Sequence, residues 1–388
     1  MMISFQERVR GVVFGTAYGD ALGATVEKLS YQEKKKRYSR VESINTEWYK
    51  ATWPAEKRLH RMRGYGIITD DTLMTLALMK VYCSQQRHLD AYDLADEFVK
   101  EIAFRNRYIP ELGKEALILD RLFYPEKYIF IRHVLANCDP REGGIGNMVN
   151  CGAAMYIAPV GVVNATNPKA AYDEAIAFAM GHQLSYGLEA AGVLAACVAK
   201  AFEPEVSVED IIKTALMYAK DGTKKAIEAI GNVAIELKSE RDNKDLIVEK
   251  FHQTILEFSP MGDDIERKIE KTGKPSNHYT PSRLFSIEEL PIALGYIVLH
   301  DGDFAQAIID GINSGRDTDS IGVMIGVILG AMHGYQVFDR TDIEILERVN
   351  QQNFLKNADQ FAKTAKIIIE KDLVQLEKRK KLLKQIAL

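Results

Sequence analysis

Two acidic motifs, far apart in the chain, carry side chains that could bind a hard metal ion. They are Thr69-Asp70-Asp71 and Asp317-Thr318-Asp319-Ser320. Each motif stands just before an apolar segment of helical character, where a hydroxyl or carboxylate commonly caps free backbone N–H groups. A cap needs only one such residue, and neighbouring carboxylates repel one another unless a cation lies between them. Either motif alone is compatible with a plain helix cap, whereas the pair predicts a metal site.

The charge and type of these side chains indicate which metals would bind. If the four aspartates converge, they bring four negative charges, which two divalent cations would neutralise. All donors are oxygens, with neutral hydroxyls from Thr69 and Ser320, so the set favours Mg²⁺, Mn²⁺ or Ca²⁺ over zinc or copper. Two such ions about 3.5–4 Å apart can hold an oxygen-rich substrate and activate a water molecule.

The segments that must position these motifs carry glycine at every fourth residue. One row follows the second motif and the other occupies the N-terminal segment: Gly322, Gly326, Gly330, Gly334, and Gly11, Gly15, Gly19, Gly23. Residues four apart share one face of a helix, so each row leaves a face without side chains. A glycine inside a helix costs about 1 kcal/mol relative to alanine. We therefore predict two helices packed backbone to backbone, with the oxygen-rich site at one end.

Composition and periodicity predict an all-α protein in one domain. The chain of 388 residues is 47% apolar and 27% charged, with a net charge of -4. These values are typical of globular proteins and give no reason to expect a nucleic acid or a membrane as partner. The four cysteines are scattered and the N-terminus lacks a signal-peptide apolar region, so we expect a cytoplasmic protein. Helical periodicity runs from 89 to about 240, and no strong strand pattern is evident.

Other segments leave alternatives open. Residues 28–68 hold many cations and both tryptophans, which fits either a lid whose cations meet substrate phosphates or a solvated insertion. The small residues of 143–161 suit either a close approach of backbone to a ligand or a plain connection between helices. His182 could contact a ligand or serve the core. Residues 259–285 are interpreted as a second long loop, and 341–388 as a charged, amphipathic helical tail.

The motifs GTAYGDALGATVE, ITDDT, CGAAM, GHQLS and NSGRDTDSIG together resemble the ADP-ribosylglycohydrolases, which include the dinitrogenase reductase-activating glycohydrolase and the ADP-ribosyl-acceptor hydrolases. The resemblance extends over about residues 5–336. It implies a single-domain orthogonal helical bundle, with residues 1–340 as the catalytic domain and 341–388 as a helical extension packed on it. It also implies two Mg²⁺ or Mn²⁺ ions, with ligands at Thr69, Asp70, Asp71, Asp317, Asp319 and Ser320.

The resemblance further implies a reaction at C1 of a ribosyl group. The family's acidic residue on a mobile flap corresponds to Glu27, which would stabilise positive charge on the sugar or take a proton from water. Asp20 would support the metal ligands from behind. Substrate contacts would fall on Asn150, Cys151, Gly152 and His182. Two departures concern the substrate, since Cys151 stands where the family commonly has Asn, and Tyr156 where it has Arg.

Three functional hypotheses follow. The first is a dimetal hydrolase that removes ADP-ribose from a protein side chain or a small acceptor. The second is the same chemistry on a free N-riboside or related nucleoside metabolite, which the two departures suggest. The third is a non-catalytic binder of ADP-ribose, which is disfavoured because the acidic ligands are present.

Overall fold

The computed structural model of the chain describes residues 3–122, 124–147, 151–258 and 287–386. The helices of eight residues or more are α1 (Phe5–Ala24), α2 (Tyr31–Tyr38), α3 (Asp70–Gln85), α7 (Tyr124–Ala136), α9 (Pro168–Ala179), α10 (Ser185–Ala201), α11 (Val208–Tyr218), α12 (Asp221–Glu236), α13 (Lys244–Leu256), α14 (Glu289–Leu299), α15 (Phe304–Asn313), α16 (Thr318–His333), α17 (Arg340–Asn350) and α18 (Phe354–Gln385). The shorter ones are α4 (Ala91–Asp93), α5 (Val99–Ala103), α6 (Ile118–Arg121) and α8 (Ala158–Val163), with single turns η1 (Leu94–Phe98), η2 (Pro110–Leu112), η3 (Pro140–Glu142), η4 (Ala154–Tyr156), η5 (Lys238–Glu240) and η7 (Tyr335–Val337).

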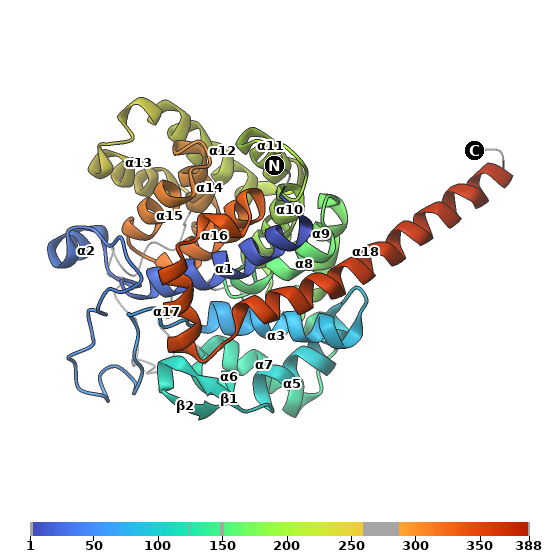
Figure 1. Ribbon diagram of the computed structural model, residues 1–388, viewed down its shortest axis with the longest axis horizontal. Helices are drawn as coiled ribbons and strands as arrows, with labels where there is room; N and C mark the ends of the chain where they lie inside the picture. The colour runs from blue at the N-terminus through green and yellow to red at the C-terminus, as the bar shows by residue number, and fades with distance from the viewer. Residues whose placement is uncertain (1–2, 123, 148–150, 259–286, 387–388) are drawn as a thin grey trace.

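This arrangement confirms the predicted all-α fold in a single domain (Figure 1). The described residues contain two short strands, β1 (Arg107–Ile109) and β2 (Lys114–Ala116), which pair as an antiparallel hairpin. No helix among the described residues combines the length and the apolar character that crossing a lipid bilayer would need.

Helices α1 and α16 form the centre of the fold and pack along each other through their glycine rows (Figure 1). A Cβ atom on Gly15 would lie 2.1 Å from the carbonyl oxygen of Gly326, and one on Gly19 would lie 2.2 Å from that of Gly322. Real Cβ atoms do not approach oxygen so closely, so only glycine permits this separation. The prediction of two helices in backbone contact is confirmed.

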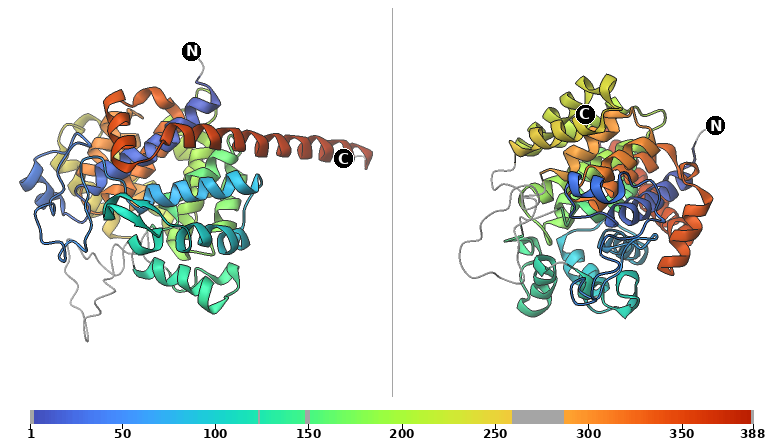
Figure 2. Two further views of the ribbon diagram at one scale, coloured as in Figure 1. Left: turned by 60° about the horizontal axis from the view of Figure 1, so that its bottom comes forward. Right: turned by 90° about the vertical axis from the view of Figure 1, so that its left-hand side faces the viewer.

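The rest of the bundle surrounds this pair. Helices α10, α14 and α15 pack against α16, while α3 and α18 pack against α1 (Figures 1 and 2). Helices α1 and α16 bury residues around most of their circumference, because neighbouring helices enclose both. Their apolar residues therefore do not form the single stripe of a surface helix. Helix α1 begins at Phe5 because the hydroxyl of Ser4 accepts a hydrogen bond from the backbone N–H of Glu7.

One detail of the sequence-based prediction is wrong. Helical periodicity from 89 to about 240 is interrupted at residues 107–116 by the β1–β2 hairpin, whose turn ends at Gly113 with φ of +63°. The segment 28–68 contains α2, an eight-residue helix that begins with a capping box of Ser30 and Glu33. Both elements are too short for an apolar period to show. The loop expected at 259–285 and Ser286 lie outside the described residues.

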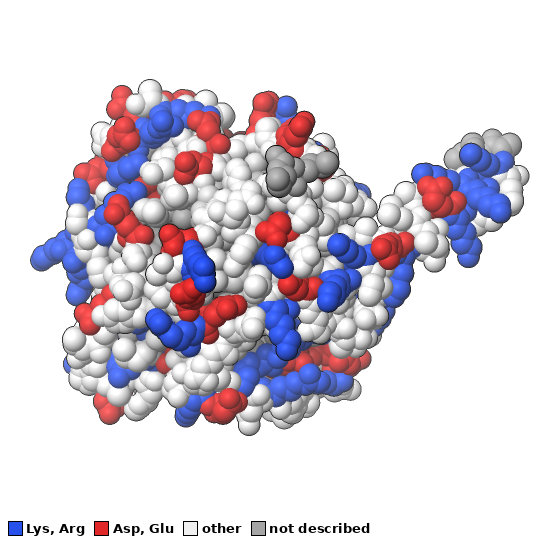
Figure 3. Space-filling view, in the orientation of Figure 1, with Lys and Arg blue, Asp and Glu red and all other residues white. Residues whose placement is uncertain are grey.

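Helix α18 is divided into a packed half and a projecting half (Figures 1 and 2). Its first half buries Phe354, Phe361 and Ile368 against the bundle. Beyond Ile369 nearly every residue is exposed, and Lys and Arg side chains gather towards its end (Figure 3). The helical tail is therefore only partly in contact with the described bundle.

We predict that Gly15→Ala destabilises the protein by about 1–3 kcal/mol or more, because the added methyl group forces α1 and α16 apart. The matched control is Gly231→Ala in α12, where a Cβ atom would meet no heavy atom within 4 Å. That change should be neutral or stabilise by up to about 1 kcal/mol, because alanine favours helix. Urea unfolding followed by circular dichroism measures both. Equal stability of the two variants would contradict the backbone contact.

Candidate metal centre

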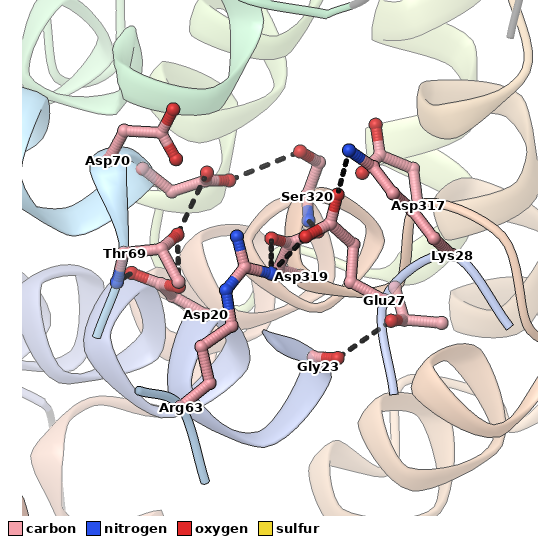
Figure 4. A network of polar contacts seen from close by, with 12 residues as sticks. Asp20, Gly23, Glu27, Lys28, Arg63, Thr69, Asp70, Asp317, Asp319 and Ser320 are labelled. Carbon is pink, nitrogen blue, oxygen red and sulfur yellow. Dashed lines mark hydrogen bonds and ion pairs between the residues drawn. The ribbon is translucent and has the colours of Figure 1, made fainter. Parts of the chain in front are cut away.

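The two acidic motifs begin two helices whose N-termini lie together. Thr69 precedes α3, which starts at Asp70, and Asp317 precedes α16. The hydroxyl of Ser320 donates a hydrogen bond of 3.2 Å to Oδ1 of Asp71, which joins the start of α16 to the start of α3 (Figure 4). Segments almost 250 residues apart in the chain thus form one acidic cluster.

Carboxylate oxygens in this cluster form two groups that share one residue. Oxygens of Asp20, Asp71 and Asp319 lie within 4.8 Å of one another, and so do oxygens of Glu27, Asp317 and Asp319. All five side chains are buried. Oxygen donors at these separations fit a hard divalent cation in each group. Asp319 would then contribute to both.

Two of the predicted ligands, Asp70 and Thr69, pair with other protein groups beside these two sets of oxygens. Asp70 belongs to neither group, because its Oδ2 forms an ion pair with Nη1 of Arg121. The hydroxyl of Thr69 donates a hydrogen bond of 2.7 Å to Asp20 and lies 3.5 Å from Oδ2 of Asp71. Both side chains lie beside the cluster, and both have a partner within the protein.

Asp20 caps helix α3 from outside that helix. Its Oδ2 accepts hydrogen bonds from the backbone N–H groups of Thr69, at 2.8 Å, and Thr72, at 3.1 Å. Thr69 makes no side-chain cap of its own. An acid near the C-terminal end of α1 opposes the dipole of that helix, but here it meets the positive N-terminal end of α3. Because Asp20 serves as the cap, the carboxylates of the first motif are not needed for capping.

The acidic cluster is electrostatically strained without cations. Burial, then the neighbouring charge of Asp319, raises the pKa of Asp71 well above its usual range. Burial, then Glu27 and Asp317, does the same to the pKa of Asp319. Burial raises the pKa of Asp20 to about 6, although hydrogen bonds from Thr72 and Thr69 oppose the shift. A site in which carboxyls are forced towards their neutral form is one that cations would stabilise.

Glu27 lies on the turn that follows α1 and points towards Arg63 (Figure 4). Its Oε2 forms an ion pair with Nη1 of Arg63, and the same nitrogen lies 3.9 Å from Oδ2 of Asp319. Two backbone hydrogen bonds of 2.9 Å tie this turn to Arg316, the residue just before the second motif; one runs from Lys28 N–H to the carbonyl of Arg316 and one from Arg316 N–H to the carbonyl of Leu29. The turn expected to be a flap is thus attached to α16.

In the segment 28–68, the cationic side chain of Arg63 faces the site, whereas that of Lys35 lies on the surface. Arg63 is buried and faces the acidic cluster. Lys35, on α2, is exposed and pairs at 2.7 Å with Asp245 of α13. One part of the segment therefore belongs to the site, and another forms a charged surface.

Sequence reasoning missed two residues of the site, Glu111 and Arg121. Glu111 is buried in the turn of the β1–β2 hairpin, and its two oxygens accept from Nε of Arg63, at 2.7 Å, and from Nε of Arg121. Arg121 ends α6 and is also buried. Neither belongs to a repeated or clustered motif, so the sequence offers no local signal for them.

Cys151 lies at the edge of the cluster. Its thiol donates a long hydrogen bond of 3.6 Å to Oδ2 of Asp317, and its sulfur also groups with carboxylate oxygens of Glu289 and Asp317. Burial, then the charge of Glu289, raises the pKa of this thiol well above its usual range, so it stays protonated and is no nucleophile. Gly152 is buried next to it, and Asn150 lies outside the described residues.

The described contacts of the His182 side chain are with core aromatic residues and not with the acidic cluster. Its ring is fully buried and stacks 5.6 Å from the ring of Tyr156, which in turn lies 5.1 Å from the ring of Phe98. A hydrogen bond of 2.9 Å joins its Nδ1 to the hydroxyl of Tyr156, and burial lowers its pKa to about 3. The prediction that His182 contacts substrate is not supported by this position, which matches the alternative of a core histidine.

Comparisons with known proteins agree on one family. The family model described as ADP-ribosylglycohydrolase matches residues 1–378. The chain is similar to the Escherichia coli K12 protein YegU, with 22% identity over 92% of this chain and 97% of that protein. It is also similar to ADP-ribosylhydrolase ARH3 of Xenopus tropicalis, with 24% identity over 86% and 89% of the two chains. A solved structure titled "ADP-ribosylglycohydrolase-related protein complex" shares the fold with a TM-score of 0.61, 19% identity and coverage of 93% and 99%.

We predict that Mn²⁺ binding to the metal-free protein releases protons and that its affinity increases from about pH 5 to about pH 8. Asp20, Asp71 and Asp319 hold protons above their ordinary pKa values, and a cation must displace them. Affinity is therefore lost as pH falls. Calorimetric titrations in two buffers of different ionisation enthalpy count the protons released. Binding with no proton release and no dependence on pH would contradict the raised pKa values.

Proposed function

The chain belongs to the ADP-ribosylglycohydrolase family, and on that basis we propose that it is a metal-dependent hydrolase that cleaves the glycosidic bond at C1 of a ribosyl group. The observation that carries the proposal is the pair of buried carboxylate groups joined through Asp319. A merely structural helix cap would not need five buried acids in two adjoining groups.

We propose two Mg²⁺ or Mn²⁺ ions as the cofactors. One group would use Asp71, Asp319 and Asp20, and the other Glu27, Asp317 and Asp319, with hydroxyls of Thr69 and Ser320 close by. Asp70 would contribute once it separates from Arg121. When bound, such ions polarise hydroxyl groups and lower the pKa of a bound water.

The protein's own side chains supply the remaining chemistry. Cleavage of a glycosidic bond places positive charge on the sugar ring, and a buried, negative cluster stabilises that charge in a water-poor environment. We propose that Glu27, one of the buried carboxylates of the cluster, takes a proton from the attacking water.

The leading substrate is an ADP-ribosylated protein side chain or small acceptor, as the name of the ARH3 relative suggests. A free N-riboside is the second candidate, and Cys151 favours it. The single S–H donor of Cys151 is directed to Asp317, so none is left for a substrate phosphate or hydroxyl. An asparagine at this position would offer two N–H donors.

We predict that the protein, with Mg²⁺ or Mn²⁺, releases ADP-ribose from ADP-ribosylated arginine or serine peptides. Asp319→Asn should lower kcat/KM by at least about a hundredfold, since it removes a carboxylate shared by both groups. Asp359→Asn is the matched control, because Asp359 pairs with Arg10 at the surface and should leave turnover unchanged. Chromatographic detection of free ADP-ribose measures the reaction. Turnover of N-ribosides alone would select the second substrate class, and no turnover of either would reject the enzyme.

We predict that Cys151→Asn shifts preference towards ADP-ribosyl peptides over N-ribosides by about tenfold or more in the ratio of kcat/KM values. The amide adds donors that the thiol lacks. Cys151→Ala keeps the site without such donors and should leave the ratio near that of the natural protein. An equal shift in both variants would assign the effect to side-chain size rather than to hydrogen bonding.

A further inference from the structure

Glu111 connects two arginines that face the acidic cluster from the same side. It is only 1% exposed, and each of its oxygens accepts a hydrogen bond from a guanidinium Nε, one from Arg63 and one from Arg121. The two guanidinium groups are arranged alike. Each uses Nε for Glu111 and turns Nη1 to a carboxylate of the site, which is Glu27 for Arg63 and Asp70 for Arg121.

Together with Lys28, whose Nζ lies 3.6 Å from Oε1 of Glu27, these arginines supply positive charge to the cluster. A guanidinium group is always ionised in proteins, so Arg63 and Arg121 keep their positive charge beside the cluster. Arg63 also lies 3.9 Å from Asp319, the carboxylate that both oxygen groups share. In the absence of a bound cation, the two arginines therefore act as counter-ions for Glu27, Asp70 and Asp319.

The same contacts compete with a metal ion. An oxygen of Asp70 that pairs with Arg121 is not available as a ligand, and a guanidinium group beside the cluster repels an entering cation. For a cation to bind, Nη1 of each arginine must leave its site carboxylate. A buried arginine that left without another partner would be an uncompensated charge, which is strongly unfavourable. Glu111 prevents this, because it keeps its hydrogen bond to each Nε.

We propose that Glu111 is a positioning residue that anchors Arg63 and Arg121 as internal counter-ions and allows them to release Glu27 and Asp70 when divalent cations bind. This inference rests on the metal site of the proposed function and adds the residues that set its affinity. Glu111 contacts no cation or substrate in this scheme and acts through the two arginines.

Two substitutions have opposite expected effects. In Glu111→Gln the arginines lose their anchoring charge and remain on Glu27 and Asp70, so affinity for Mn²⁺ falls about 10–100-fold, as for other residues behind metal ligands. In Arg121→Gln the competitor for Asp70 is removed, so Mn²⁺ binds more tightly than in the natural protein. A purely structural role would weaken binding in both variants.

Glu101 provides the matched control. It is buried and also pairs with two arginines, Arg105 and, at 2.6 Å, Arg107. Within the described part of the chain, this trio shares no residue with the acidic cluster. Glu101→Gln therefore imposes the same loss of a buried, doubly paired carboxylate and should leave Mn²⁺ affinity unchanged.

The test is calorimetric titration of Mn²⁺ into the full-length, metal-free protein and its three variants, with circular dichroism to verify folding. Weaker binding in Glu111→Gln and tighter binding in Arg121→Gln, with Glu101→Gln unchanged, support the proposal. Natural affinity in Glu111→Gln, or weaker binding in Arg121→Gln, overturns it. If Glu111→Gln does not fold, the direction of the change in Arg121→Gln decides. Hydrolysis is not part of this readout, so an absence of turnover rejects the proposed function without affecting this result.

Discussion

The close approach of α1 to α16 is the constraint on which the site depends. A Cβ atom on Gly23 would lie 2.3 Å from the carbonyl oxygen of Thr318, so the contact continues to the start of α16. There the hydroxyl of Thr318 donates a hydrogen bond of 2.7 Å to the carbonyl of Gly23. This joins the second acidic motif to the segment that carries Asp20 and Glu27. The glycines thus determine where the carboxylates stand, although none of them takes part in chemistry.

The negative charges of these neighbouring acids must be compensated by several positive or hydrogen-bonding groups. The N-terminal end of α3 stabilises Asp20 through backbone N–H groups. Arg63 and Arg121 provide fixed positive charge on one side, held by Glu111. Burial, followed by the charges of neighbouring carboxylates, nevertheless raises the pKa values of Asp71 and Asp319 well above their usual range. With the cations of the proposed function bound, the cluster would be balanced between protons, arginines and cations, and each would affect how strongly the others bind.

The sequence reveals those parts of the site that are local patterns. The rows of glycine and the two acidic motifs repeat or cluster within a few residues, so the central helix pair and the positions of Asp71 and Asp319 could be inferred. Glu111 and Arg121 are single charges in a short hairpin and a four-residue helix, and only the fold brings them to Arg63. The sequence could not show that Asp70 faces an arginine, nor that His182 stacks in the core.

Tyr156 and Cys151, the two residues predicted to depart from the family pattern, lie in different places, one in the core and the other at the edge of the acidic cluster. Tyr156 is fully buried, packs 5.1 Å from the ring of Phe98 and bonds to His182, so it contributes apolar packing where an arginine would bring charge. Cys151 instead reaches Asp317 at the edge of the cluster. Of the two residues, Cys151 reaches the acidic cluster, whereas Tyr156 packs in the core. A shift in the proposed substrate preference would therefore act through Cys151 rather than through Tyr156.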